Sequence, residues 1–182
     1  MPLSPEQAAE KARRVRMVIM DVDGVLTDGR VFYGGDVQGV QFNVHDGTGI
    51  KYLHRGGVQT GIITGRSVRA VLTRAEDLGI EHVVQGAKVK LDAYDAIGER
   101  TGLPDECVAF VGDDLTDIPV LRRVGFAVTV PNAAAEVLQM ADHVTEKCGG
   151  EGAVRELAEF ILKAQGKWAD ILARYLPERK ES

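Results

Sequence analysis

Residues 15–29 read VRMVIMDVDGVLTDG, and this stretch decides the fold. An apolar run of strand length stops at Asp21, and a second carboxylate follows at Asp23, just before Gly24. A buried carboxylate must be paired or bound to a metal, so two acids at the end of a buried strand are costly in a plain core strand. One interpretation is a metal and phosphate site at the carboxyl end of a first β-strand. The other is a strand that leaves into a solvated turn, and this stretch alone leaves both open.

Length and composition are those of one ordinary globular domain. The chain has 182 residues, of which 45 % are hydrophobic, 27 % charged and 5 % aromatic, with 21 glycines. We therefore expect a single domain over residues 1–182 with a sizeable core. The 22 basic and 27 acidic residues give a net charge of -5, and no basic run or aromatic–basic platform occurs, which argues against nucleic-acid binding.

Nothing in the sequence points to a membrane or to secretion. No apolar run approaches the roughly 18 residues of a membrane span, and the N-terminus lacks the apolar core of a signal peptide. The two cysteines, Cys107 and Cys148, have no metal-type spacing, and Cys107 lies in an apolar run. We expect a cytoplasmic protein, with Cys107 as a buried free thiol.

Strands and helices alternate along the chain. The patterns predict strands at 15–20, 60–64, 82–86, 107–112, 126–130 and 143–145. They predict helices at 4–14, after a loop at 45–49, at 67–78 with Ser67 as its cap, and at 88–100, 116–124, 133–141 and 151–165. Two β-rich pieces within residues 30–44 flank a glycine-rich turn and predict a hairpin. Several strands are continuous apolar runs, which is typical of a parallel sheet covered on both faces.

The expected fold class is therefore α/β. It is a doubly wound, Rossmann-like parallel sheet with helices on both faces and a small β-hairpin flap after the first strand. The intervals 28–60 and 66–90 are too short for a separate cap domain. A polar tail occupies residues 166–182.

Polar side chains follow several of these strands, and ligands bind beyond the carboxyl ends of strands in such sheets. Mg²⁺ prefers carboxylate oxygens, whereas a phosphoryl group needs hydroxyl, ammonium and backbone N–H donors. An Asp oxygen can attack phosphorus, and a second Asp nearby can protonate the leaving alcohol and activate water. Each residue alone could be a helix cap or a solvated side chain, but together they favour a magnesium and phosphate site. They are Asp21, Asp23, Thr64, Lys90, Asp113, Asp114 and Asp117.

Four of these stretches resemble the motifs of the haloacid dehalogenase-like phosphatase superfamily. They are DVDGVLTD at 21–28, TGR at 64–66, Lys90, and GDDLTD at 112–117, so the likeness covers nearly the whole chain. Within the superfamily, FNVHDG at 42–47, Gln85-Gly86, GGEGAVRE at 149–156 and AQGK at 164–167 are most similar to one subgroup. That subgroup consists of the phosphatases of 3-deoxy-D-manno-octulosonate 8-phosphate (KDO 8-P), a sugar acid phosphate of lipopolysaccharide synthesis.

The resemblance implies a Mg²⁺-dependent phosphomonoesterase. Asp21 would be the nucleophile that forms an aspartyl-phosphate. Asp23 would be the general acid and base and would give Mg²⁺ its backbone carbonyl. Asp113 would complete the metal ligands with Asp114 in support, Asp117 would orient Lys90 or the metal waters, and Thr64, Gly65 and Lys90 would hold the phosphate. The candidate substrate contacts are Asn43, Asp46, Gly47, Lys51, Arg66 and Arg74; Arg suits carboxylate recognition. At His45, related sequences often carry a more basic residue.

The resemblance also implies a homotetramer in which a neighbour's hairpin and tail cover the site. The hairpin at 30–44 and the tail from Gly166 fit that role. A solvated turn and a frayed terminus are the alternative.

Two alternatives to KDO 8-P hydrolysis stay open. A phosphatase of a nine-carbon sugar acid 9-phosphate (KDN or sialic acid type) would use the same motifs with a different pocket. A phospho-acceptor signalling domain also combines acids, a Thr and a Lys on a parallel sheet. The order of motifs here, and an acid two residues after the nucleophile, favour turnover instead.

Overall fold

The computed structural model describes residues 2–34 and 37–176, and its centre is a six-stranded parallel sheet. The strand order is β5-β4-β1-β6-β7-β8, so the strand that precedes Asp21 lies inside the sheet. The strands are β1 (Met17–Met20), β4 (Gln59–Ile63), β5 (His82–Val84), β6 (Val108–Val111), β7 (Phe126–Thr129) and β8 (His143–Val144). The expected fold class is confirmed.

Alternating side chains of the sheet feed two separate cores, as the period of a β-strand requires. On β1, Val18 and Met20 pack into one core and Met17 and Ile19 into the other. Because both faces are covered, all four residues are buried, which explains the continuous apolar run.

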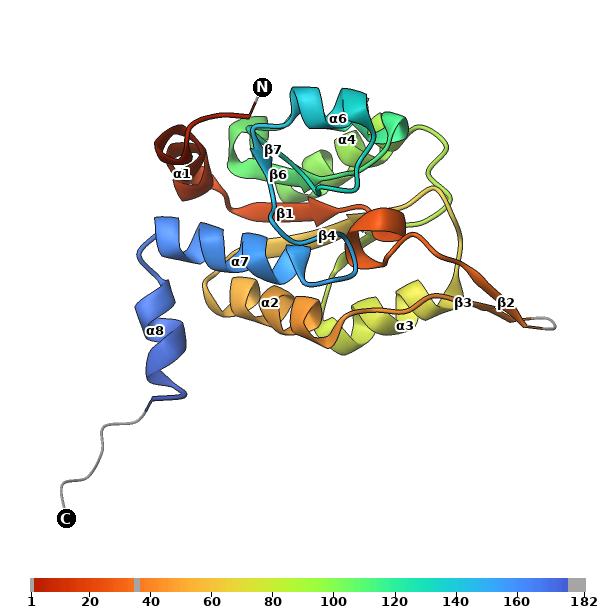
Figure 1. The fold of residues 1–182 in the computed structure, drawn as a ribbon, viewed down its shortest axis with the longest axis horizontal. Helices are drawn as coiled ribbons and strands as arrows, with labels where there is room; N and C mark the ends of the chain where they lie inside the picture. The colour runs from red at the N-terminus through yellow and green to blue at the C-terminus, as the bar shows by residue number, and fades with distance from the viewer. Residues whose placement is uncertain (1, 35–36, 177–182) are drawn as a thin grey trace, which may run out of the picture.

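Helices cover both faces of the sheet. One face carries α1 (Pro5–Arg14), α2 (Val44–Arg55), α3 (Arg69–Leu78) and α7 (Ala153–Ala164). The other carries α4 (Lys90–Thr101), α5 (Ile118–Leu121) and α6 (Ala135–Met140). In Figure 1, α2, α3 and α7 lie beneath the sheet, and α4 and α6 lie above it. None of the helices in the described part of the chain is long and apolar enough to cross a membrane.

The hairpin is present, but its second strand was predicted too late in the sequence. It pairs β2 (Phe32–Gly34) with β3 (Val37–Gly39), and Gly34 lies opposite Val37. Residues 40–43 lead into α2 without joining the ladder. Residues 35–36 of the predicted glycine-rich turn lie outside the described residues. The hairpin projects from the body (Figure 1).

Two helix starts also differ from the prediction. Residues 45–49 are not a loop, because the Asn43 side chain accepts a hydrogen bond from His45 N (2.8 Å) and starts α2 earlier. Gly49 sits inside this helix because a Cβ there would lie 2.7 Å from Arg155 Cα of α7. Ser67 does not cap α3, which starts after Val68 without a side-chain cap.

The C-terminal region and Cys107 also correct the prediction. Residues 166–182 are not simply a tail, because α8 (Trp168–Ala173) forms within them and buries Ile171. Trp168 packs edge-on against Tyr52 of α2, with ring centroids 5.7 Å apart. Residues 177–182 lie outside the described part. Cys107 is a free thiol but only half-buried, since it lies at the end of a short 3₁₀ turn before β6.

Candidate active site

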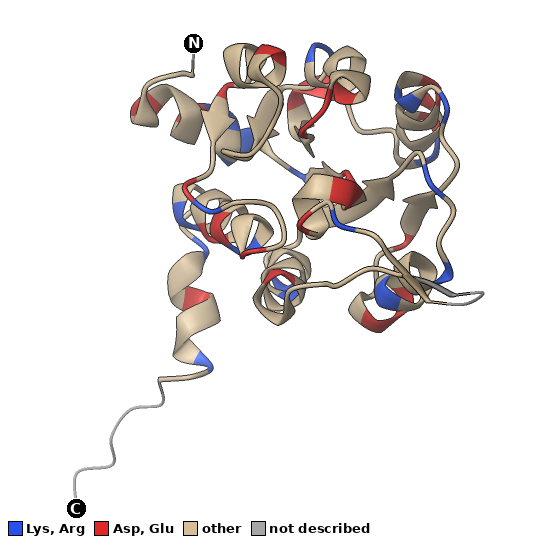
Figure 2. Ribbon diagram, turned by 45° about the vertical axis from the view of Figure 1, so that its right-hand side comes forward, with Lys and Arg blue, Asp and Glu red and all other residues tan. Residues whose placement is uncertain are grey.

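A cavity of about 330 Å³ lies at the carboxyl ends of β1, β4 and β6. Figure 2 turns this edge of the sheet forward, with acidic segments in red at the ends of the central strands. The residues that line it are Asp21, Asp23, Thr64, Gly65, Arg66, Ala87, Lys88, Lys90, Asp113, Asp114 and Thr116.

A tight turn follows β1 and carries the two acids of the opening stretch. Asp21 N still donates to Val111 O of β6 (2.9 Å), so the sheet fixes the position of this residue. The chain then bends at Gly24, whose φ of +94° suits glycine. The buried Thr27 hydroxyl holds the bend, since it donates to Val22 O (3.1 Å) and accepts from Gly24 N (3.4 Å).

Lys90 forms ion pairs with two of the buried acids. It is the first residue of α4, it is 6 % exposed, and its Nζ lies 3.0 Å from Asp21 Oδ1 and 2.6 Å from Asp117 Oδ1. Burial opposes its charge, but the two carboxylates outweigh burial and raise the pKa of Lys90. The lysine therefore stays cationic beside the predicted nucleophile.

Asp117 holds the loop after β6 in place. Its Oδ2 accepts from Asp113 N (3.0 Å) and from Asp114 N (3.1 Å), while its Oδ1 binds Lys90. Gly112 must lack a side chain, because a Cβ there would lie 2.5 Å from Asp117 Cβ. Asp114 faces the cavity and caps the following turn through Leu115 N (2.8 Å).

The three clustered carboxylates carry more negative charge than Lys90 can neutralise. One oxygen from each of Asp21, Asp113 and Asp117 lies within 4.8 Å of the others. Burial, and next the charge of Asp117, raises the pKa of Asp21 to about 6. Burial, and next the charge of Asp21, raises the pKa of Asp113 to about 7. Asp113 Oδ1 is buried with no hydrogen-bond partner among the described residues. Since both Asp117 oxygens are engaged, Asp21 and Asp113 offer the oxygens that a hard divalent cation needs.

Thr64 and Arg66 form the opposite wall. Thr64 N donates to Val84 O (3.0 Å), and its buried hydroxyl accepts from Arg66 N (3.3 Å). Arg66 Nη1 lies 2.8 Å from Asp23 Oδ1, in a pair that is partly open to solvent. The predicted acid and base therefore has a cationic neighbour at the mouth of the cavity.

Five of the predicted substrate contacts do not line this cavity. They are Asn43, Asp46, Gly47, Lys51 and Arg74. Asn43 caps α2 and donates to Gly150 O (3.1 Å), and Asp46 accepts from Arg155 N (2.8 Å). Arg74 Nη2 donates to Asn43 O (3.2 Å) and crowds Gly47, and Lys51 is an exposed residue of α2.

Two residues beside the site were not predicted from motif chemistry. Gln85 accepts from Val68 N (2.8 Å) and donates to Val68 O (3.1 Å), which ties down the segment between Thr64 and α3. Asn132 donates to Gly24 O (3.4 Å) and accepts from Gly149 N (3.0 Å). Asn132 follows a buried strand, as Asp21 and Asp113 do, and that shared pattern could have singled it out.

Comparisons with known proteins give relatives over nearly the whole chain. Residues 47–125 match the haloacid dehalogenase-like hydrolase family. The 3-deoxy-D-manno-octulosonate 8-phosphate phosphatase of Salmonella typhimurium is 43 % identical over 167 residues, which cover 91 % of this chain and 88 % of that protein.

Solved structures agree with the sequence relatives. The crystal structure of the corresponding phosphatase from Yersinia pestis superposes with a TM-score of 0.89 and 41 % identity, over 90 % of this chain and 89 % of that chain. The Moraxella catarrhalis phosphatase, solved with magnesium, phosphate and KDO, gives a TM-score of 0.91 and 38 % identity, over 93 % and 98 % of the two chains. The chain is a phosphatase that belongs to the haloacid dehalogenase-like hydrolases and, within them, to the family of 3-deoxy-D-manno-octulosonate 8-phosphate phosphatases.

Proposed function

We propose that this chain hydrolyses KDO 8-P to KDO and phosphate with Mg²⁺, through an aspartyl-phosphate on Asp21. The observation that carries the chemistry is the position of Asp21 in the cavity, 3.0 Å from the Lys90 ammonium and beside the unpartnered oxygen of Asp113. The substrate is inferred from the family's named members.

Asp21, Asp113 and the backbone carbonyl of Asp23 are the proposed metal ligands. The surplus of buried negative charge fits a divalent cation, as does Asp113 Oδ1, which has no hydrogen-bond partner in the described part of the chain. When bound, Mg²⁺ supplies positive charge that offsets the charge of the phosphate and of the carboxylates.

The chain's own residues account for the covalent steps. An Asp21 oxygen attacks phosphorus and the ester P–O bond breaks, while Asp23 gives its proton to the leaving sugar oxygen. Asp23 then takes a proton from the water that attacks the aspartyl-phosphate, and phosphate leaves with Asp21 regenerated. Lys90 and the Thr64 hydroxyl hold the phosphoryl oxygens throughout.

Arg66 is the proposed contact for the substrate's carboxylate, because it lines the cavity as a cation, as Lys88 and Lys90 do, and its guanidinium matches the shape of a carboxylate. Its pairing with Asp23 means that an arriving carboxylate competes for the guanidinium. Asn43, Asp46, Gly47, Lys51 and Arg74 would reach substrate only through a neighbouring copy, since the cavity of their own chain does not include them.

We further propose that the single domain acts in the cytoplasm as a homotetramer whose neighbours cover the open cavity. Phe32 and Tyr33 of the projecting hairpin are 70 % and 69 % exposed, and Tyr175 and Leu176 after α8 are also exposed. We take these exposed apolar side chains as the surface that neighbouring copies cover. Sedimentation of wild type against Phe32→Ser/Tyr33→Ser tests the assembly; an unchanged sedimentation coefficient would contradict it.

The function is tested by phosphate release from KDO 8-P, a nine-carbon sugar acid 9-phosphate and neutral sugar phosphates, each with Mg²⁺ or with chelator. We expect kcat/KM to be highest for KDO 8-P and activity to vanish with chelator. A preference for the nine-carbon acid would replace the substrate. A long-lived phosphorylated Asp21 without turnover would contradict the proposed hydrolysis and support a phospho-acceptor signalling domain.

A further inference from the structure

The loop between β7 and α6, residues 130–134, touches both halves of the candidate site. Ala134 N donates to Asp113 O (2.8 Å). Two residues earlier, Asn132 Nδ2 donates to Gly24 O at 3.4 Å, near the outer limit of a hydrogen bond. The loop therefore holds the backbone of Asp113 and the backbone of the turn that carries Asp21 and Asp23.

The amide oxygen of Asn132 binds a second segment, residues 149–150, which packs against the same turn. Its Oδ1 accepts from Gly149 N at 3.0 Å, and Gly150 N donates to Val25 O at 3.0 Å. A Cβ on Gly149 would fall 1.7 Å from Gly24 O, so the two backbones are in direct contact there. Asn132 thus fixes Gly149, and Gly149 presses on Gly24.

The position of Gly24 sets the geometry of the carboxylates. A Cβ on Gly24 would fall 2.1 Å from Asp113 Oδ2, so the turn passes directly against the Asp113 carboxylate. Gly24 is next to Asp23 and three residues from Asp21. A displacement of a few tenths of an ångström at Gly24 would change how both acids face Asp113, and catalytic geometry tolerates little such change.

We propose that Asn132 is a positioning residue for the reaction: it locks Gly149 against Gly24 and so holds the turn of Asp21 and Asp23 in register with Asp113. The part of this inference that concerns kcat rests on the function proposed above. The part that concerns backbone motion does not, because hydrogen exchange can be measured without any substrate. Asn132 does not line the cavity, so it acts through the turn and not on the substrate.

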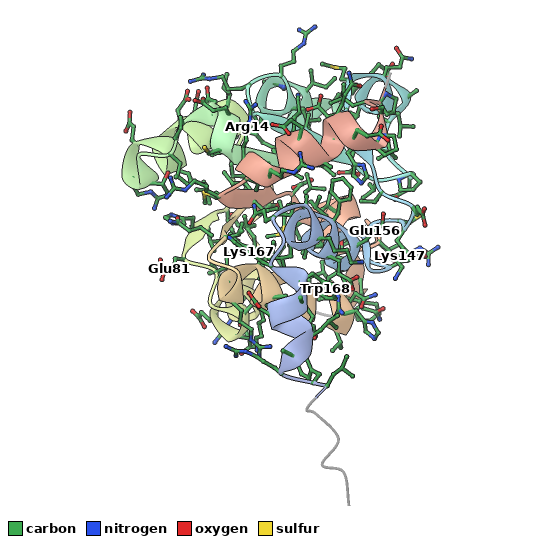
Figure 3. All side chains as sticks on the ribbon, turned by 90° about the vertical axis from the view of Figure 1, so that its left-hand side faces the viewer. Arg14, Glu81, Lys147, Glu156, Lys167 and Trp168 are labelled. Atoms are coloured by element: carbon green, nitrogen blue, oxygen red, sulfur yellow. The ribbon has the colours of Figure 1, made fainter. Side chains whose placement is uncertain are left out.

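The test compares Asn132→Ala and Asn132→Asp with a matched control, Gln165→Ala. Gln165 is also an amide that makes two hydrogen bonds to the backbone, to Ala12 O (3.2 Å) and Val15 O (2.7 Å). It lines a hollow at the amino end of β1 together with Arg16 and Lys167, and Lys167 is labelled in Figure 3. A merely structural role would give the two alanine variants the same profile.

We expect Asn132→Ala to lower kcat about tenfold or more with KM changed less than about twofold. Asn132→Asp keeps the acceptor for Gly149 N but puts a carboxylate oxygen beside Gly24 O in place of the amide donor, so it should recover part of kcat and stay above Asn132→Ala. Gln165→Ala should lower the melting temperature and leave kcat unchanged. Hydrogen exchange measured by mass spectrometry should speed up in the peptide that spans residues 21–28 for Asn132→Ala alone.

Equal kcat in Asn132→Ala and wild type, or a loss equal to that of Gln165→Ala, would overturn the proposal. So would an Asp variant no better than the Ala variant. If the wild type released no phosphate from any substrate, the proposed function would fail. The exchange rates of residues 21–28 would still decide on Asn132, and unchanged rates would overturn the proposal.

Discussion

The two ends of the parallel sheet carry cavities of similar size but opposite chemistry. At the amino ends of β4 and β5, a cavity of about 370 Å³ is lined by residues that include His54, Thr60, Glu81 and His82. Figure 3 views the molecule from this side, with Glu81 labelled. Its buried Thr60 hydroxyl is paired with His54 Nε2 at 2.6 Å. At the carboxyl ends, about 330 Å³ of space is lined by Asp21 and Asp113, which cluster with the buried Asp117, and Lys90 pairs with Asp21 and Asp117.

The difference teaches that unbalanced charge, and not the size of the hollow, marks the working end. A paired neutral group such as Thr60 needs nothing further. Asp21, Asp113 and Asp117 oppose one another across a few ångströms, and Lys90 neutralises only part of their charge. An arrangement that raises carboxylate pKa values in this way costs stability unless a ligand is bound, which is typical of active sites.

The sharpest way to break the comparison is Asp21→Asn. Loss of the nucleophile should lower turnover about 10³-fold or more, while the fold persists because a neutral amide replaces a carboxylate whose pKa is raised by burial. The measurement is phosphate release together with thermal melting. Asp95→Asn, an exposed change on α4, serves as the control and should retain full activity. Residual turnover of a tenth or more would remove Asp21 as the nucleophile.

Lys90→Met should lower both the activity and the stability of the protein. It leaves Asp21 and Asp117 buried without their cation, and breaking a buried pair costs about 3–5 kcal/mol of unfolding free energy. Urea unfolding measures the loss. The double variant Lys90→Met/Asp117→Asn should recover part of that stability but none of the activity. Full stability in Lys90→Met would mean that the carboxylates need no cation.

Sequence reasoning predicted the carboxyl end of the sheet because its signals are local. A buried parallel strand must be apolar, so an acid directly after it stands out, and parallel strands bring such acids to one edge. Asp21 and Asp113 line the cavity for this reason, together with Thr64, which directly follows β4, and Lys90, which begins the helix after β5.

The failures concern features that packing decides. Gly47 and Gly49 look like loop residues, but they lie within α2, and a side chain there would clash with Arg74 or Arg155. Asn43, which is predicted to contact substrate, does not line the cavity of its own chain, because its side chain caps α2 and donates to Gly150 O. The helix at 168–173 forms in a polar tail because Trp168 meets Tyr52, about 116 positions earlier in the chain. Such partners are known only once the fold is known.

Removal of metal should give the two ends opposite pH dependences. The raised pKa of Asp113, about 7 when folded against about 3.9 when unfolded, means that the folded chain binds more protons between these values. Its stability in chelator should therefore fall as pH rises from about 4 to 7. Burial lowers the pKa of His54, so the amino end contributes stability that rises as pH approaches about 6.5.

The difference between wild type and Asp113→Asn isolates the carboxyl-end contribution. In chelator at pH 8, Asp113→Asn should melt a few degrees higher than wild type, at about 2–4 °C per kcal/mol for a chain of this length. At pH 4 the two should melt together. Mg²⁺ at pH 8 should raise the melting temperature of wild type but not of the variant, because only wild type keeps both carboxylates. A constant difference across the pH range would show that Asp113 is not the titrating group.

The smallest expected effect is at the amino end, with Thr60→Val. The change is close in shape, but it removes the Thr60 hydroxyl of β4, which pairs with Nε2 of His54 in α2. Loss of one such hydrogen bond should cost about 1 kcal/mol of unfolding free energy, without any change in kcat or KM. Melting and steady-state kinetics measured on the same preparation check both halves of this expectation. A fall in kcat would mean that the cavity at the amino end communicates with the site, and the two ends could then no longer be treated as independent.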